Sequence, residues 1–242
     1  MANRYRVLSV LGVLSLLAVA SYYIYTPGPW DSEKTEKRHG FIYYLPVTAF
    51  VDPKWVRMNT VLSRAQVVCD SNDVAAAARN FTCDMTVAAV PGWGHLCTKT
   101  RAMFVELCRT RSYAGHRFIA KIDDDAIIDP LVEEYIETHY NDGQEGHVYF
   151  GTTYGPSTRY DPANNTWFGG WFNGFNTEVM DQICDCDLPE CVPAMGEDQW
   201  TGYVLGRCGV RKRDLVVPVD LVHHKNYGTK RLQISFKAIR NR

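Results

Sequence analysis

The segment from Phe118 to Asp129 constrains this chain more than any other. It reads FIAKIDDDAIID, an apolar strand-like run that ends in three consecutive aspartates and returns at once to apolar residues. Adjacent carboxylates repel one another, and burying them at the edge of a sheet is costly without a counter-charge. A divalent cation supplies such a charge, and hard oxygen ligands favour Mg²⁺ or Mn²⁺. The alternative is a solvated acidic turn in which Asp129 caps the following helix.

The spacing of the three aspartates indicates which of them share a side. In an extended segment, Asp123 and Asp125 face one side of the chain and Asp124 faces the other. The carboxyl end of a strand is also where open α/β sheets bind their ligands. We therefore expect Asp125 to bind the metal ion, with Asp123 as second choice and Asp124 as a further contact to the bound group.

Strand-like and helix-like patterns alternate along the rest of the chain, which predicts an α/β layer architecture. A length of 242 residues fits one large domain. The charges nearly balance, with 26 Lys and Arg against 27 Asp and Glu, so we expect no nucleic-acid partner. The patterns predict strands over 41–47, 65–69, 117–122 and 147–153, and helices over 98–110, 130–139 and 198–205.

The N-terminal region resembles a membrane anchor. Arg4 and Arg6 precede an uncharged run, 7–25, that nearly spans a hydrocarbon core of about 30 Å. The basic flank predicts a cytosolic tail (1–6), a signal-anchor (7–25), a stem (26–39) and a lumenal domain (40–242). The alternative is a cleaved signal peptide with a site at 18–20, which yields a secreted protein.

The 8 cysteines predict disulfides and an oxidising compartment. Cys69 with Cys83, and Cys97 with Cys108, are candidates for local pairs, but eight cysteines allow 105 connectivities and the sequence alone does not select one. The irregular spacing of the later cysteines argues against a zinc site. Glycosylation sequons at Asn80 and Asn164 agree with lumenal exposure.

Four motifs resemble those of the β-1,3-glycosyltransferases, the family of the β-1,3-galactosyl- and N-acetylglucosaminyltransferases and the Fringe proteins. The matches occur in the family's order and extend over residues 96–224. A late histidine, His223 or His224, lies where Fringe-type members have a metal-binding histidine. The matching segments are Leu96–Thr100 (LCTKT), Lys121–Ile128 (KIDDDAII), Gly169–Phe175 (GGWFNGF, similar to a glycine-rich loop) and Gly196–Gly202 (GEDQWTG, similar to a Glu-Asp motif).

This resemblance implies a GT-A fold, a Rossmann-like mixed sheet flanked by helices in a single catalytic domain. It further implies transfer of galactose or an N-acetylhexosamine from a UDP-sugar, with inversion, to a hydroxyl of a glycan or glycoprotein acceptor, in a β-1,3 linkage. The expected location is the Golgi or ER membrane. Asp198 is the expected base, with Glu197 as second choice, and His223 or His224 would complete the coordination of Mn²⁺ or Mg²⁺.

Four more residues are candidates for binding the donor. Lys99, at a helix N-terminus, is expected to meet the diphosphate, and Asp70 the uridine or its ribose. Gly169 and Gly170 would let the backbone approach a sugar closely. Each residue also has a purely structural explanation. Lys99 would be a solvated lysine, Asp70 would cap a loop, and Gly169 and Gly170 would form a plain turn.

Two other functions fit parts of the sequence. A non-catalytic lumenal carbohydrate-binding protein or chaperone could share the scaffold. The triplet and the Glu-Asp pair argue against this alternative, because a scaffold released from catalysis need not retain both. A metal-dependent phosphoesterase would use the aspartates, but it lacks the further His and Asp ligands that such enzymes have.

Overall fold

The computed structural model describes residues 39–47, 56–57, 59–71, 82–89, 93–141, 146–153, 167–192 and 195–224. The predicted cytosolic tail and anchor, the stem up to residue 38 and the asparagines of both sequons lie outside these ranges. Within them, none of the helices has the length and hydropathy needed to cross a membrane.

The core of the described structure is a mixed sheet of seven strands in the order β3-β2-β1-β4-β7-β6-β8. Strand β7 runs antiparallel to both of its neighbours, β4 and β6, and the remaining pairs are parallel. The predicted α/β class is therefore confirmed. The strands are β1 (His39–Pro46), β2 (Gln66–Asp70), β3 (Met85–Val87), β4 (His116–Ile122), β6 (His147–Gly151), β7 (Phe172–Asn176) and β8 (Lys212–Val216).

The strand order reverses between β1 and β4. The chain adds β2 and β3 on one side of β1 and then places β4 on the other side. Open α/β sheets bind ligands at the carboxyl ends of the strands beside such a reversal. Tyr44 of β1 pairs with Lys121 of β4, so the end of β1 lies beside the start of the acidic triplet.

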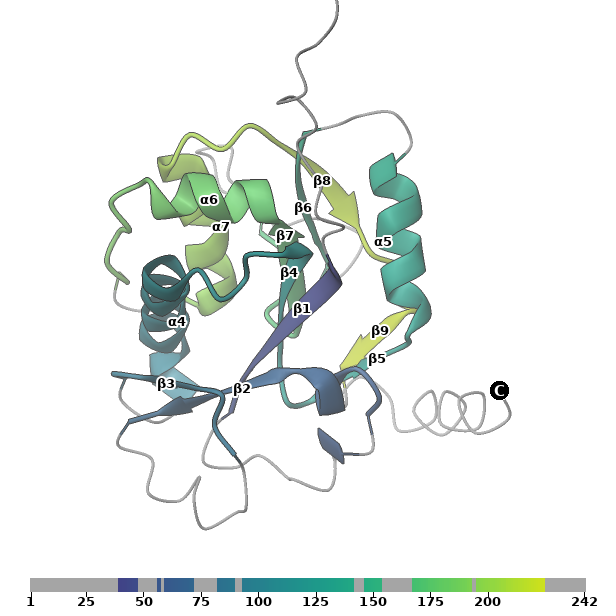
Figure 1. Ribbon diagram of the computed structural model, residues 1–242, viewed down its shortest axis with the longest axis horizontal. Helices are drawn as coiled ribbons and strands as arrows, with labels where there is room; N and C mark the ends of the chain where they lie inside the picture. Colours follow the sequence, from purple (N-terminus) through teal and green to yellow (C-terminus); the bar gives the residue numbers. More distant parts are fainter. Residues whose placement is uncertain are drawn as a thin grey trace, which may run out of the picture. The chain divides into compact units, whose positions relative to one another are not determined.

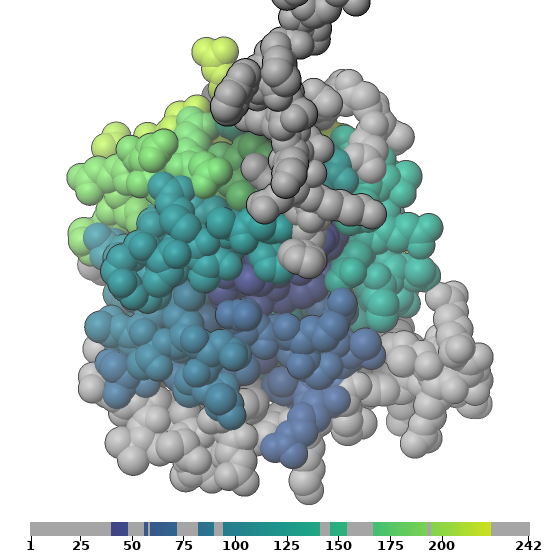
Figure 2. All heavy atoms as spheres, in the orientation of Figure 1, coloured from purple at the N-terminus to yellow at the C-terminus, as the bar shows by residue number. Residues whose placement is uncertain are grey.

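Helices cover both faces of the sheet (Figure 1). Helices α4 (Leu96–Thr110), α6 (Thr177–Cys184) and α7 (Glu197–Arg207) lie on one face, and α5 (Leu131–Asn141) lies on the other. Met103 and Leu107 of α4 belong to one core cluster, and Val132 and Ile136 of α5 belong to the other. On the face shown in Figure 2, little of β1 reaches the surface, because neighbouring elements cover it. The predicted helices match α4, α5 and α7 to within two residues at each end.

Small elements complete the fold. The 3₁₀ helices η1 (Leu62–Arg64) and η2 (Trp93–His95) precede β2 and α4. Strands β5 (Ala126–Ile128) and β9 (Val222–His224) form a separate antiparallel pair. Asp129, after β5, accepts a hydrogen bond from Leu131 N at 2.9 Å, which confirms its expected role at the start of α5.

The segment Gly169–Phe175 is not simply a loop. Its second half begins β7, which lies between β4 and β6 inside the sheet. A Cβ on Gly174 would lie 2.3 Å from Ile119 O and 2.6 Å from the Phe150 ring, so packing requires glycine here. The Asn-Gly pair resembles a turn signal, and tertiary packing overrides it.

One predicted disulfide is confirmed and one is wrong. Cys69 pairs with Cys83, but Cys97 and Cys108 do not pair with each other. Both lie on α4, where eleven residues advance the helix by about 16 Å, far more than a disulfide spans. The remaining pairs are Cys97–Cys191, Cys108–Cys184 and Cys186–Cys208. Four disulfides fit a secreted or lumenal protein.

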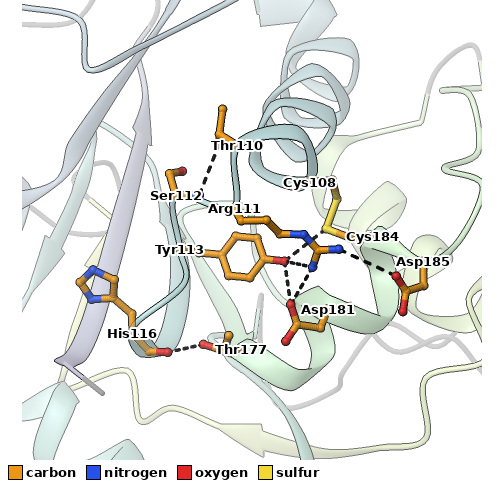
Figure 3. Close-up of polar contacts among 10 residues, drawn as sticks. All are labelled: Cys108, Thr110, Arg111, Ser112, Tyr113, His116, Thr177, Asp181, Cys184 and Asp185. Atoms are coloured by element: carbon orange, nitrogen blue, oxygen red, sulfur yellow. Dashed lines mark hydrogen bonds and ion pairs between the residues drawn. A yellow bond between two sulfur atoms is a disulfide. The ribbon is translucent and has the colours of Figure 1, made fainter. Parts of the chain in front are cut away.

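A polar cluster joins the end of α4 to α6 (Figure 3). Tyr113 Oη donates to Asp181 Oδ1 at 2.8 Å and accepts from Arg111 Nη1 at 2.5 Å. Burial and then Asp181 raise the pKa of Tyr113 to about 12, so its hydroxyl keeps its proton. Thr177 Oγ1 donates to His116 O at the start of β4. The cluster therefore lies at the end of β4 opposite the acidic triplet and braces the scaffold.

Candidate functional site

The acidic triplet forms a turn at the carboxyl end of β4. Asp123 N donates to Trp171 O at 3.1 Å, and Ala126 N donates to Asp123 O at 3.1 Å, which closes the turn before β5 begins. The expected alternation of an extended segment is therefore wrong here, since Asp124 and Asp125 occupy the middle of a turn. All three aspartates are partly exposed, so the turn presents its carboxylates at the edge of the sheet.

The ammonium of Lys121 provides a counter-charge to the aspartates, a role for which the sequence predicted only a metal ion. Its side chain is only 5 % exposed, and Nζ donates to Asp123 Oδ1 at 2.5 Å and to Gly170 O at 2.7 Å. Glu197 Oε1 lies 3.5 Å from the same nitrogen. An ammonium has three N–H donors, and these three acceptors match them.

The charges around Lys121 shift the pKa values of the group. Burial lowers the pKa of Lys121, but Asp123, Glu197 and Asp198 raise it by more, so the ammonium stays charged. Burial raises the pKa of Asp123 to about 7, against the opposing effect of Lys121 and with a further rise from Glu197. One ammonium among the carboxyl groups of the triplet and of 197–198 leaves this edge net acidic, which favours a bound cation.

Gly170 gives room to Glu197. A Cβ on Gly170 would lie 2.0 Å from Glu197 Oε1 and 3.6 Å from Asp123 Oδ2. A Cβ on Gly169 would lie 3.3 Å from the Trp171 ring, and Gly169 N donates to Thr152 O at 2.6 Å. The two glycines thus form a tight turn before β7, with Gly170 directly against the acidic side chains.

Asp198 reaches this edge on the first turn of α7. Its side chain is buried, and Oδ1 accepts a hydrogen bond from Gln199 N at 2.8 Å. Burial, and then the charge of Glu197, raise the pKa of Asp198, while the Gln199 N–H and Lys121 oppose the shift. A raised pKa increases the ability of a carboxylate to take up a proton, as a base must.

Lys99 and Asp70 bind each other one strand away from the reversal. Lys99 Nζ lies 3.0 Å from Asp70 Oδ2 and also donates to Val47 O, and the two side chains are 3 % and 2 % exposed. Lys99 is therefore not a solvated lysine. Asp70 ends β2, and its Oδ1 is buried with no hydrogen-bond partner among the residues that the structure describes. Because an unpaired buried carboxylate oxygen is costly, this atom is a ready acceptor for a ligand donor.

The two late histidines lie on β9, beside the residues that follow the triplet. In the strand register, His224 pairs with Ala126 and His223 pairs with Ile127. The structure describes the backbone of His224 but not its side chain. In the part of the chain that the structure describes, no three His, Cys, Asp or Glu side chains form a metal-binding group. A cation here would take one or two carboxylates and complete its shell with phosphate oxygens and water, as Mg²⁺ commonly does.

The structure brings most predicted site residues to one edge of the sheet. The triplet, Gly170, Glu197 and Asp198 lie together, and Asp70 with Lys99 lies at the end of β2. Sequence reasoning missed Lys121. The sequence does contain a signal for its role: Lys121 lies in an apolar run two residues before Asp123. Residues i and i+2 of a strand share a face, so the two side chains can be expected to meet.

Comparisons with known proteins find structural similarity at low sequence identity. No family model matches the chain, and no curated protein matches it. Among solved structures, A197 from STIV aligns over 74 % of this chain and 82 % of its own, at 14 % identity and a TM-score of 0.43. A cytidylyltransferase from Leptospira borgpetersenii serovar Hardjo-bovis aligns over 74 % and 76 %, at 9 % identity and a TM-score of 0.40. At these values neither likeness bears on the function of this chain.

Proposed function

We propose that this protein is a metal-dependent, inverting glycosyltransferase of the GT-A type that uses a UDP-sugar donor and a glycan or glycoprotein hydroxyl as acceptor. One observation carries the proposal. The motifs that resemble the β-1,3-glycosyltransferases are far apart in sequence, yet Asp123, Gly170 and Glu197 all lie within hydrogen-bonding distance of Lys121 Nζ. They meet beside the strand-order reversal, where sheets of this class bind ligands.

The donor's nucleoside would bind near Asp70. Its free Oδ1 is a buried acceptor, and in dinucleotide-binding sheets an acidic residue downstream of the first strand accepts a hydrogen bond from a ribose hydroxyl. Lys99 holds the other carboxylate oxygen, which fixes the direction in which Oδ1 points. Lys99 thus orients Asp70 in this proposal, rather than meeting the diphosphate itself.

The diphosphate would bind at the acidic triplet. Asp125 is the expected holder of the cation, with Asp123 second, and Asp124 and one of His223 and His224 are further candidates. A bound Mn²⁺ or Mg²⁺ would neutralise the charge that develops on the leaving diphosphate. Lys121 contributes by favouring the ionised form of Asp123 and by holding its carboxylate at the end of β4.

Asp198 would take the proton from the acceptor hydroxyl. A positioned base contributes about 10²–10⁴-fold in rate, and its pKa works best when raised toward neutrality. The pKa of Asp198 is raised in this way by burial and by Glu197. Glu197, held near Lys121, is the second candidate.

A panel of UDP-sugars tests the proposal. With Mn²⁺ present, the correct donor should raise the midpoint of thermal unfolding by mass action and be hydrolysed slowly without an acceptor. EDTA should abolish both effects. Stabilisation without any hydrolysis or transfer would instead support the non-catalytic carbohydrate-binding alternative, and a lack of any donor effect would refute the proposal. The Golgi or ER location is part of the same proposal, to which the four disulfides lend support.

A further inference from the structure

We infer that Lys121 is a positioning residue that sets the distance between the acidic turn after β4 and the acid pair on α7. This inference rests on the proposed function, because it concerns how the diphosphate site and the base are held relative to each other. The ammonium of Lys121 contacts three separate chain segments: Asp123 after β4, Gly170 before β7 and Glu197 at the start of α7.

The backbone already fixes two of these three segments. Strands β4 and β7 pair along their length, with Lys121 opposite Asn173 and Ile122 opposite Phe172. The first turn of α7 belongs to a helix layer outside the sheet (Figure 1), and Lys121–Glu197 is a direct side-chain contact between that turn and β4. A change at Lys121 is therefore expected to move α7 more than it moves β7.

A purely stabilising role explains this lysine poorly. Removing an ammonium and carboxylates from water is expensive, and well-packed apolar side chains often stabilise a fold as much as a buried ion pair does. The side chain of Lys121 is only 5 % exposed and lies within the apolar part of β4, residues 118–122. What an apolar residue could not do is hold two carboxylates from different segments at one point.

The consequence for the reaction is geometric. Without the ammonium, Asp123 and Glu197 would repel each other, and Glu197 would turn away together with Asp198, its neighbour on the first turn of α7. A displacement of about 1 Å between reacting groups can cost about 10²-fold in rate. In this proposal donor binding depends mainly on the cation held at Asp125 and on the nucleoside contact at Asp70, so it should change much less.

The chain offers a matched control. On β8, Lys212 donates to Asp214, which is the same lysine–aspartate spacing that Lys121 and Asp123 have on β4. Neither Lys212 nor Asp214 belongs to the candidate site. Lys212→Met therefore removes a comparable pair without touching the acidic turn or α7.

The experiment compares Lys121→Met, Lys121→Arg and Lys212→Met with the wild-type protein. It measures kcat and KM for Mn²⁺-dependent hydrolysis of UDP-galactose and UDP-N-acetylhexosamines, the affinity for UDP with Mn²⁺ by calorimetry, and amide hydrogen exchange over 197–201. Lys121→Met should lower kcat about 10²-fold, change the donor KM less than about threefold, and speed exchange in the first turn of α7. Lys121→Arg should recover part of kcat, and Lys212→Met should match the wild type.

The outcomes separate this inference from the proposed function. A wild-type kcat in Lys121→Met, or losses of kcat and of UDP affinity in equal proportion, would overturn the positioning role while leaving the glycosyltransferase proposal intact. A wild-type protein that neither binds UDP with Mn²⁺ nor hydrolyses a donor would refute the proposed function and this inference with it. If Lys121→Met does not fold, Lys121→Arg decides: lowered kcat at unchanged KM supports the role, and unchanged kcat overturns it.

Discussion

The carboxylate of Glu197 occupies the space beside Gly170, with Oε1 2.0 Å from the point where a Cβ on residue 170 would lie. The sequence suggested that this glycine leaves room for a sugar, and the structure gives the room to an acidic side chain. Because Oε1 is the end of a flexible side chain, a methyl group at 170 would displace Glu197 from Lys121 more readily than it would unfold the protein.

Gly170→Ala is therefore expected to lower the stability by about 1 kcal/mol, the low end of the range for overpacking, and to lower turnover by a larger factor. Urea denaturation and donor hydrolysis measure the two effects. Gly94→Ala is the matched control, because among the described residues no atom apart from those of its chain neighbours lies within 4 Å of a Cβ at that position. Equal effects of the two substitutions on turnover would contradict the placement of Glu197.

Asp125→Asn tests the metal site. The substitution keeps the shape of the side chain in the turn and removes one negative charge from the acidic edge. If Asp125 holds the cation, Mn²⁺-dependent turnover should fall about 10²-fold or more, since metal assistance contributes several kcal/mol. The residual activity should then be the same with Mn²⁺ and with EDTA.

The control for that variant is Asp129→Asn, which makes the same chemical change four residues later. Asn is as good a helix cap as Asp, so the hydrogen bond from Leu131 N should survive and the Mn²⁺ response should stay normal. A normal Mn²⁺ response in Asp125→Asn as well would move the metal site away from this turn.

The sequence predicted the strand that carries the triplet and the helix that carries Glu197 and Asp198, because both have clear local patterns. It could not predict that Lys121 binds Asp123 and Glu197 together, since Glu197 approaches only through the packing of α7 on the sheet. Likewise, β7 is a strand because Gly174 fits against Ile119 and Phe150, and no local pattern records that contact.

The wrong cysteine pair has a different origin. Cys108 lies in the segment predicted to be a helix, 98–110, and Cys97 directly precedes that segment, so the helix rise already places the two sulfurs too far apart to pair. Their true partners lie far along the chain: Cys184 ends α6, and Cys191 lies on the segment between α6 and α7. Such long-range partners follow from the packing of α4 against α6 and α7, which sequence spacing does not reveal.

The disulfides should differ in their contribution to stability. Cys97–Cys191 closes a separation of 94 residues and Cys69–Cys83 one of 14. In a background that lacks the nested Cys108–Cys184 bridge, which otherwise shortens the longer loop, these loops correspond in the chain-entropy account to about 4.7 and about 3 kcal/mol, so replacing Cys97 and Cys191 with alanines should cost more. Denaturant titration of the two double variants measures the difference. A larger loss for Cys69–Cys83 would show that local strain or residual structure, not loop length, decides the order.

Asp198→Asn tests both the proposed base and the pH dependence of stability. Asn keeps an oxygen to accept from Gln199 N but cannot take up a proton, so donor binding should persist while transfer falls about 10²–10⁴-fold. The pKa of Asp198 is raised in the folded state, by burial first and by Glu197 second. Between its unfolded value of about 3.9 and that raised value, the native protein binds more protons than the unfolded chain, so Asp198 lowers stability as pH rises through this window.

The variant should therefore be at least as stable as the wild type at pH 7, and its advantage should shrink as the pH falls toward about 4, where Asp198 is protonated in both states. Urea denaturation of both proteins at several pH values, with Asp129→Asn alongside, measures the trend. Asp198→Asn should bind donor normally, turn over slowly and become more stable relative to the wild type as the pH rises. This result would show that Asp198 serves catalysis and lowers the stability of the fold. Unchanged turnover would remove Asp198 as the base, and Glu197→Gln would then be the variant to test.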